Sequence, residues 1–193
     1  SIRRVNRLRH MGSNSEQLLK WRHHLHSIAE TAFNEVNTSK YIAEQLEQLG
    51  LEVTTGIGGT GVIGTLKRGT SNISIALRAD MDGLPLQEKS GAPYAQRSGS
   101  MHACGHDVHT TILLGAAKIL WSLKDEFEGT IKLLFQPGEE KNPGGASYMI
   151  RDGALKNPVP QGIIGLHVHP GLAHGKLSFR KGRVMASADE LYI

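Results

Sequence analysis

Residues 73–82 read ISIALRADMD, an apolar stretch that runs directly into two carboxylates, Asp80 and Asp82. The first five residues of this stretch have the length and composition of a short buried strand. Farther along, residues 108–123 carry apolar side chains at helical spacing, namely Ile112, Leu113, Ala116, Ile119 and Leu120. A buried strand followed by an amphipathic helix predicts a unit of an α/β sheet.

The same alternation continues on both sides of residues 73–82. Further helices are expected at residues 15–30, 38–49 and 146–152, with Gly50 ending the second of them. Further strands are expected at residues 51–55, 62–66, 130–135, 162–166, 177–179 and 188–193. This order predicts one α/β sheet with parallel members, and the last expected strand lies at the very end of the sequence.

Composition excludes several classes of protein. The chain has 193 residues, 39% of them hydrophobic, which is enough for one ordinary core. No apolar run approaches the roughly 18 residues of a membrane span. A single cysteine cannot form an internal disulfide, and the N-terminus has no signal-peptide core, so a cytoplasmic location is expected.

The net charge of +4 comes from one end of the chain. Residues 1–14 hold four arginines and no acid, and 22 basic residues less these four equal the 18 acidic ones. The rest of the chain is therefore neutral, which argues against a nucleic-acid-binding surface. We interpret residues 1–14 as a disordered or artificial basic tail, with Met11 as a plausible natural start, and expect the folded domain to begin at residue 15.

The run MHACGHD at residues 101–107 holds the only cysteine of the chain, Cys104, beside His106. Cys104 has three readings: a buried apolar residue, a nucleophile or a metal ligand. Nearby carboxylates raise the pKa of a thiol, which disfavours a free nucleophile unless a cation compensates. A divalent cation would do so, and thiolate, imidazole and carboxylate together are ligands of transition metals.

Acids and histidines also follow two other expected strands. Glu139 and Glu140 come after residues 130–135 and a Pro-Gly turn, and His167 follows residues 162–166. Ligands of open α/β sheets collect at the carboxyl ends of strands, so these side chains are expected to converge with Asp80 and Asp82. A bare Glu-Glu pair is more often a solvated turn, but here one carboxylate would bind metal while the other takes a proton from water.

The remaining histidines carry less information. His23, His24 and His26 lie on the first expected helix, and His174 lies in an expected loop. His102, His109 and His169 flank the motifs and are candidates for supporting positions around the site.

Four ordered blocks resemble the co-catalytic metallopeptidase family of aminoacylases and carboxypeptidases. The similarity is closest to its amidohydrolase branch of N-acyl-amino-acid, hippurate and indole-acetyl-amino-acid hydrolases. The blocks are residues 77–85, 101–107, 135–140 and 165–168, and residues 21–49, including Phe33, Glu35 and Thr38, resemble the opening helices of the family. The resemblance runs from about residue 16 to the end and implies a mostly parallel central sheet with helices on both faces, as in zinc exopeptidases.

The resemblance also implies a site with two divalent metal ions, zinc, manganese or cobalt. Its ligands here would be Cys104, His106, Glu140 and His167. Glu139 would be the general base, and Asp82 would orient a ligand or support the site. Asp80, His102, Asp107 and His169 would stand behind the ligands or line the substrate pocket.

The implied activity is cleavage of the amide bond of N-acyl amino acids or small peptides by a homodimeric enzyme. The partner would be this small substrate, with no nucleic acid and no membrane. Residues 186–193 would begin an inserted α+β lid and dimerisation domain. The last metal-binding histidine and most of that lid would lie beyond Ile193, so we expect the isolated chain to be poorly active or inactive.

Two positions depart from the family pattern. Ala29 stands where the family usually has a proline, and His169 replaces a common aromatic residue. Two alternatives stay open beside the two-metal hydrolase: a non-catalytic metal-binding or regulatory fragment of the same fold, and an enzyme with a cysteine nucleophile.

Overall fold

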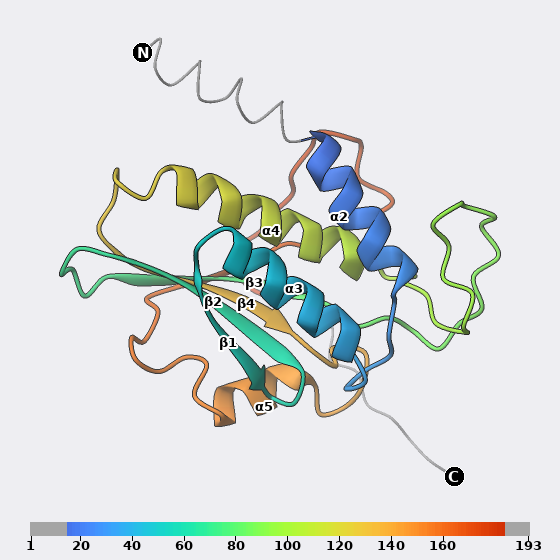
Figure 1. Ribbon diagram of the computed structural model, residues 1–193, viewed down its shortest axis with the longest axis horizontal. Coiled ribbons are helices and arrows are strands. Elements are labelled where there is room, and N and C mark those ends of the chain that lie inside the picture. Colours follow the sequence, from blue (N-terminus) through green and yellow to red (C-terminus); the bar gives the residue numbers. More distant parts are fainter. Residues whose placement is uncertain (1–14, 184–193) are drawn as a thin grey trace.

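The computed structural model describes residues 15–183, which build one five-stranded sheet with helices on both faces (Figure 1). The helices are α2 (Ser15–Ser27), α3 (Val36–Gln48), α4 (His106–Ser122) and α5 (Gly145–Arg151). The strands are β1 (Glu52–Ile57), β2 (Gly61–Arg68), β3 (Ser74–Asp80), β4 (Gly129–Gln136) and β5 (Ile163–Gly165).

The sheet is mixed, with the strand order β1-β2-β4-β3-β5. Strand β3 pairs in parallel with both β4 and β5, whereas β2 pairs antiparallel with β1 and β4. The expected α/β class with helices on both faces is confirmed. Its parallel part is the β4-β3-β5 half, where α4 connects β3 to β4 and provides the long crossover that a parallel pair needs.

The core consists of two layers, one on each face of the sheet. Helices α2, α3 and α4 cover one face, and α5 lies against the other (Figure 1). Strand β4 is buried along its whole length, and its side chains alternate between the layers: Leu133 and Phe135 face the three helices, and Leu134 packs near α5 with Met149. A strand covered on both faces reads as a nearly continuous apolar run, as β4 does.

Most of the expected elements are present, with ends that differ by a few residues. The strand expected at residues 177–179 is wrong, because the chain has no regular structure there and the side chains of Leu177 and Phe179 are 83% and 96% exposed. An isolated apolar stretch does not form a strand without a neighbour to accept its backbone hydrogen bonds.

Three expectations lie outside the described residues: the tail at residues 1–14, the strand at 188–193 and the domain start at 186. The division of the chain at these points therefore stays a prediction. Across residues 15–183, no helix has the length and apolar character needed to cross a membrane.

Candidate metal centre

The functional side chains meet at one edge of the sheet because three strands end there together. Asp80 closes β3 in register with Gln136 at the end of β4, and β5 runs parallel beside β3. Asp82, the Glu139–Glu140 pair and His167 follow these three strand ends, and α4 begins with His106. The convergence expected for the carboxyl ends of parallel strands thus occurs for Asp82, the glutamate pair and His167.

His106 lies at the centre of this cluster and is fully buried. Its Nδ1 is 3.2 Å from Oδ1 of Asp82. An ionised carboxylate only accepts hydrogen bonds, so Nδ1 donates to Asp82, and Nε2 keeps a lone pair when the ring is neutral. Burial opposes protonation of His106, but Asp82, Asp80 and Glu140 raise its pKa. Nε2 is 3.7 Å from Oε1 of Glu140, and neither of these two buried atoms has a hydrogen-bond partner in the described part of the chain.

His167 has the same tautomer for a different reason. Its Nδ1 donates to the backbone carbonyl oxygen of Val168 at 2.7 Å, which leaves the lone pair on Nε2. That nitrogen lies 3.5 Å from Sγ of Cys104. Burial, together with Glu140, Glu139 and Asp80, raises the pKa of the Cys104 thiol to about 12. A thiol in this electronegative setting is a poor free nucleophile, and a cation is what would ionise it.

Donor atoms are close enough to share cations. Cys104, His106 and His167 offer ligand atoms within 4.8 Å of one another, and so do His106, Glu139 and Glu140. His106 belongs to both triads and to a third group with Asp80 and His109, so the groups adjoin. A sulfur, two imidazole nitrogens and carboxylate oxygens form a donor set for zinc-like divalent ions. Together with the unpartnered Nε2 and Oε1 atoms, this set fits a metal centre.

Asp82 fixes the position of two of these donors. While Oδ1 faces His106, Oδ2 accepts a hydrogen bond from the backbone N–H of Glu140 at 2.9 Å. Asp82 is itself buried. One carboxylate therefore links the start of α4 to the turn after β4.

Glu139 is the more exposed member of the glutamate pair. Its side chain is 42% exposed, compared with 23% for Glu140. Burial and the charges of Glu140 and Asp80 raise the pKa of Glu139. An accessible carboxylate with a raised pKa, close to the donor atoms, has the properties of a general base.

Asp80 is held by neighbours that the sequence alone did not single out as its partners. Its Oδ1 accepts from Nδ1 of His109 at 2.6 Å, and its Oδ2 accepts from Arg78 at 2.8 Å. Burial opposes ionisation, but the His109 hydrogen bond and the charge of Arg78 lower the pKa of Asp80 to about 2. His109 also accepts from the backbone N–H of Val168 at 2.9 Å. Both of its nitrogens are thus used, and it links Asp80 to the His167 segment.

The spacing of His109 could have revealed this role. Residues three apart on a helix share a face, and His109 lies three residues after His106 on α4. The partners Arg78 and Val168 carry no comparable sequence signal.

Asp107, in the first turn of α4, and His102, just before that helix, are both buried. Asp107 accepts hydrogen bonds from Arg22 at 2.9 Å and from His26 at 2.8 Å, and the other nitrogen of His26 faces Glu88. His26 is therefore a buried member of a polar network on α2, not a surface residue. His102 is also buried, and burial lowers its pKa to about 4.

His169 is not brought to the donor atoms by any contact observed in residues 15–183. It is exposed, and its Nδ1 accepts from the backbone N–H of Gly171 in its own loop. The structure thus gives no sign of the pocket-wall position expected for His169.

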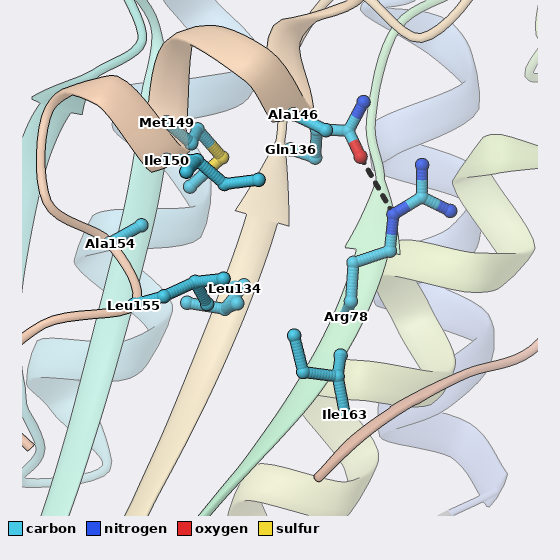
Figure 2. A pocket seen from close by; sticks show the side chains of 9 residues that line it. All are labelled: Arg78, Leu134, Gln136, Ala146, Met149, Ile150, Ala154, Leu155 and Ile163. Carbon is cyan, nitrogen blue, oxygen red and sulfur yellow. Dashed lines mark hydrogen bonds between the residues drawn. The ribbon is translucent and has the colours of Figure 1, made fainter. Parts of the chain in front are cut away.

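A separate cavity of about 160 Å³ lies on the α5 face of the sheet (Figure 2). Leu134, Met149, Ile150 and Ile163 form apolar walls, and Arg78 donates to the side-chain oxygen of Gln136 at 2.8 Å at its upper end. No acid, cysteine or histidine lines this cavity, so its chemistry is unlike that of the metal centre.

Comparison with known proteins agrees with this geometry. Residues 76–187 match the model of peptidase family M20/M25/M40, which is more than half of the chain. The hippurate hydrolase of Campylobacter jejuni is 46% identical over 175 residues, and the match covers 90% of this chain and 45% of that enzyme. The N-acyl-L-amino acid amidohydrolase of Geobacillus stearothermophilus is 38% identical over 177 residues, covering 91% of this chain and 47% of the enzyme.

Solved structures give the same result. A dinuclear metal-binding peptidase of the M20 family from Bacillus subtilis superposes with a TM-score of 0.76 at 38% sequence identity. That match covers 81% of this chain and 44% of the peptidase. The chain thus spans about half the length of the relatives it matches.

Proposed function

The chain belongs to peptidase family M20/M25/M40, and on this premise we propose that its site serves a metal-dependent amidohydrolase. The substrates are N-acyl amino acids or small peptides, and the bond cleaved is the amide. The observation that carries the proposal is the pair of adjoining donor triads around His106. The named activities of the two curated relatives support the substrate class.

We assign the ligands residue by residue. Cys104, His106, Glu140 and His167 would hold two divalent cations, of which the family contains a dinuclear example. The unpartnered nitrogen of His106 and the Nε2 of His167, which faces Sγ of Cys104, support their roles as neutral imidazole ligands. Zinc, manganese and cobalt all suit this mixture of sulfur, nitrogen and oxygen donors, with sulfur favouring the softer ions.

The cations would polarise the scissile carbonyl and make water a better nucleophile at neutral pH. Glu139 accepts the proton of the attacking water and returns it to the leaving nitrogen as the amide bond breaks. Its exposed position lets it reach substrate, and its raised pKa lets it hold the proton between the two steps. Asp82 keeps His106 and the Glu140 backbone in place throughout.

The supporting residues complete the proposal. Asp80 holds the start of α4 through His109, and Asp107 holds it through Arg22 and His26. His102 fills the buried space next to it. His169 keeps its proposed place near the substrate, supported only by its position two residues after His167.

Metal content and substrate turnover of the full-length protein test the proposal together. We expect at least one equivalent of zinc, manganese or cobalt per chain, and hydrolysis of at least one compound in a panel of N-acyl amino acids. Less than one equivalent of metal would contradict it. Bound metal without any turnover across the panel would favour a non-catalytic metal-binding or regulatory module instead.

We also propose two properties of the whole protein. A homodimer follows from the family resemblance, and sedimentation velocity of the full-length protein tests it. A cytoplasmic location is supported by the single cysteine, which stays unpaired as a free thiol in the structure, and cell fractionation tests it.

A further inference from the structure

The turn that carries Glu139 and Glu140 is held by a carboxylate from a distant part of the sequence. Glu35 lies just before α3, and its side chain has no exposed surface. Its Oε1 accepts a hydrogen bond from the backbone N–H of Gly138 at 2.8 Å. Its Oε2 accepts from the hydroxyl of Thr60 at 2.5 Å. Glu35 therefore connects the loop after α2, the β1–β2 turn and the turn after β4.

The backbone around Gly138 leaves little room for movement. Phe33, two residues before Glu35, packs its ring so closely on Gly138 that a Cβ there would lie 2.4 Å from Cζ of the ring. The carbonyl oxygen of Gly138 accepts from the N–H of Gly145 at 3.0 Å, at the start of α5. Phe33 itself has a φ of 64°, a strained value for a bulky residue, and its ring contacts Tyr148.

Two carboxylates thus hold successive parts of one turn. Glu35 binds the N–H of Gly138, and Asp82 binds the N–H of Glu140. Glu139 lies between these two fixed amides, so the direction of both glutamate side chains depends on them. Oε1 of Glu140 lies 3.7 Å from Nε2 of His106, and a shift of either amide would change the backbone from which this side chain extends.

The carboxylate of Glu35 does more than fill space in the core. Burial raises the pKa of Glu35, and the hydrogen bonds from Thr60 and Gly138 oppose that rise. Among residues 15–183 no ion pair to Glu35 is found, so hydrogen bonds alone satisfy it. An apolar side chain would fill the same volume without the cost of desolvation, but it would leave the Gly138 N–H unpaired.

We propose that Glu35 is a positioning residue for the metal centre, which acts through the Gly138 amide to aim Glu139 and Glu140 at His106. This inference rests on the proposed function, because it assumes that Glu140 binds metal. Glu35 touches neither the donor atoms nor the open side of the site. Its effect is transmitted by the backbone of the turn, and residues of the metal centre itself stay chemically unchanged when Glu35 is replaced.

The test compares Glu35→Met with Glu35→Gln in the full-length protein. Methionine keeps the length and volume of the side chain but has no oxygen. Glutamine keeps one carbonyl oxygen for the Gly138 N–H, and its amide can donate to Thr60. Thr60→Val is the matched control, because it removes the other hydrogen bond of Glu35 and leaves the contact with Gly138 in place.

The first measurement is Co²⁺ affinity by calorimetric titration of the metal-free protein. We expect Glu35→Met to weaken Co²⁺ binding about 10- to 100-fold, the range found for groups that orient metal ligands. Glu35→Gln should restore affinity to within a few-fold of wild type, and Thr60→Val should change it little. Equal Co²⁺ affinity in Glu35→Met and wild type would overturn the inference.

The second measurement needs no metal and no stable variant. In the metal-free wild-type protein, the amide hydrogen of Gly138 should exchange slowly with solvent, as a buried bonded amide does. Rapid exchange at Gly138 would reject the role of Glu35 even if Glu35→Met failed to fold. Wild-type protein that binds no Co²⁺ would refute the proposed function instead, and the exchange of Gly138 would still decide whether Glu35 holds the turn.

Discussion

At the scale of single residues, hydrogen-bond partners separate the histidines into different roles. His106 and His167 each donate through Nδ1, to a carboxylate and to a carbonyl, and each keeps a lone pair on Nε2 beside other donors. His109 uses both nitrogens and has no free lone pair. His26 lies between two carboxylates and serves a polar network. The partner of each ring therefore indicates its function better than the residue type does.

Replacement of Glu139 by glutamine should abolish catalysis and spare metal binding. Glutamine has the same shape but cannot take the proton from water, so kcat should fall about 10²- to 10⁴-fold. Metal content after gel filtration should stay at the wild-type value. Glu140→Gln is the matched control next to it, and it should lower metal content. Substantial activity in Glu139→Gln would remove Glu139 from the role of base.

Asp80 should make stability depend on pH in the acid range. Its pKa is about 2 in the folded state compared with an ordinary value of 3.8. A lowered pKa adds stability that is present above pH 4 and is lost as the pH falls towards 2, by about 2 kcal/mol in total.

Urea unfolding of metal-free protein between pH 2 and pH 6 measures this effect. The Asp80→Asn variant should show a shallower loss of stability on acidification than wild type. Glu47→Gln, a change at an exposed position on α3, should keep the wild-type profile. Identical profiles for Asp80→Asn and wild type would show that the Asp80 contacts with His109 and Arg78 add no stability.

At the scale of elements, the turn after β4 decides how the site is assembled. Strand β4 is buried on both faces, and Gly138 just after it has a φ of 57°, which turns the chain away from the strand direction. This turn places two carboxylates at the sheet edge instead of continuing the strand. The elements that surround the turn, namely the loop before α3 and the start of α5, come from both sides of the sheet.

Gly138→Ala should therefore lower stability and activity more than the same substitution at Gly144. Both Gly138 and Gly144 have positive φ, 57° and 87°, so alanine costs about 1–2 kcal/mol of backbone strain at either position. Only at Gly138 would the new methyl group meet the ring of Phe33, since nothing lies within 4 Å at Gly144.

Thermal unfolding and activity distinguish the two variants. We expect both to unfold at a lower temperature, with the larger drop and a marked loss of activity in Gly138→Ala. Equal effects of the two substitutions would mean that Phe33 yields easily and that the turn is not confined.

At the scale of the whole molecule, the metal centre joins parts that the sheet alone does not connect strongly. His167 is exposed and follows β5, a strand of three exposed residues at the sheet edge. It reaches the centre through Sγ of Cys104, through edge-on ring contacts with His109 and His106, and through the hydrogen bond from Val168 to His109. A bound cation would tie this edge to α4 and to the turn after β4, and binding to the native state stabilises a fold.

Metal removal should consequently lower the stability of the molecule. A chelator should reduce the melting temperature, and zinc, manganese or cobalt should restore it. At a free concentration 100 times the dissociation constant, one bound ion adds about 2.7 kcal/mol. Magnesium, which prefers oxygen ligands, is the control and should restore less. A melting temperature that is insensitive to chelator and added metal would contradict a centre that links these elements.

The sequence by itself determined the class of fold and predicted which side chains gather at one edge of the sheet. Local patterns are sufficient for both, because apolar periodicity reports which elements form, and acids after apolar strands mark a sheet edge. The runs ending in Asp82, Glu140 and His167 thus predicted a common site before any contact was known. The likeness of four blocks to a hydrolase family added the chemistry, and the family match bears out that resemblance.

Only the tertiary structure decided how the site is held together. It set the antiparallel direction of β2 and the contacts of Asp80 with Arg78 and His109. It also joined Glu35 to the amide of Gly138, 103 positions away in the sequence. Such contacts depend on how elements pack, and sequence periodicity carries no information about which distant partner a buried polar group finds. The same reason explains the incorrect strand at residues 177–179, since a strand exists only where a neighbour pairs with it.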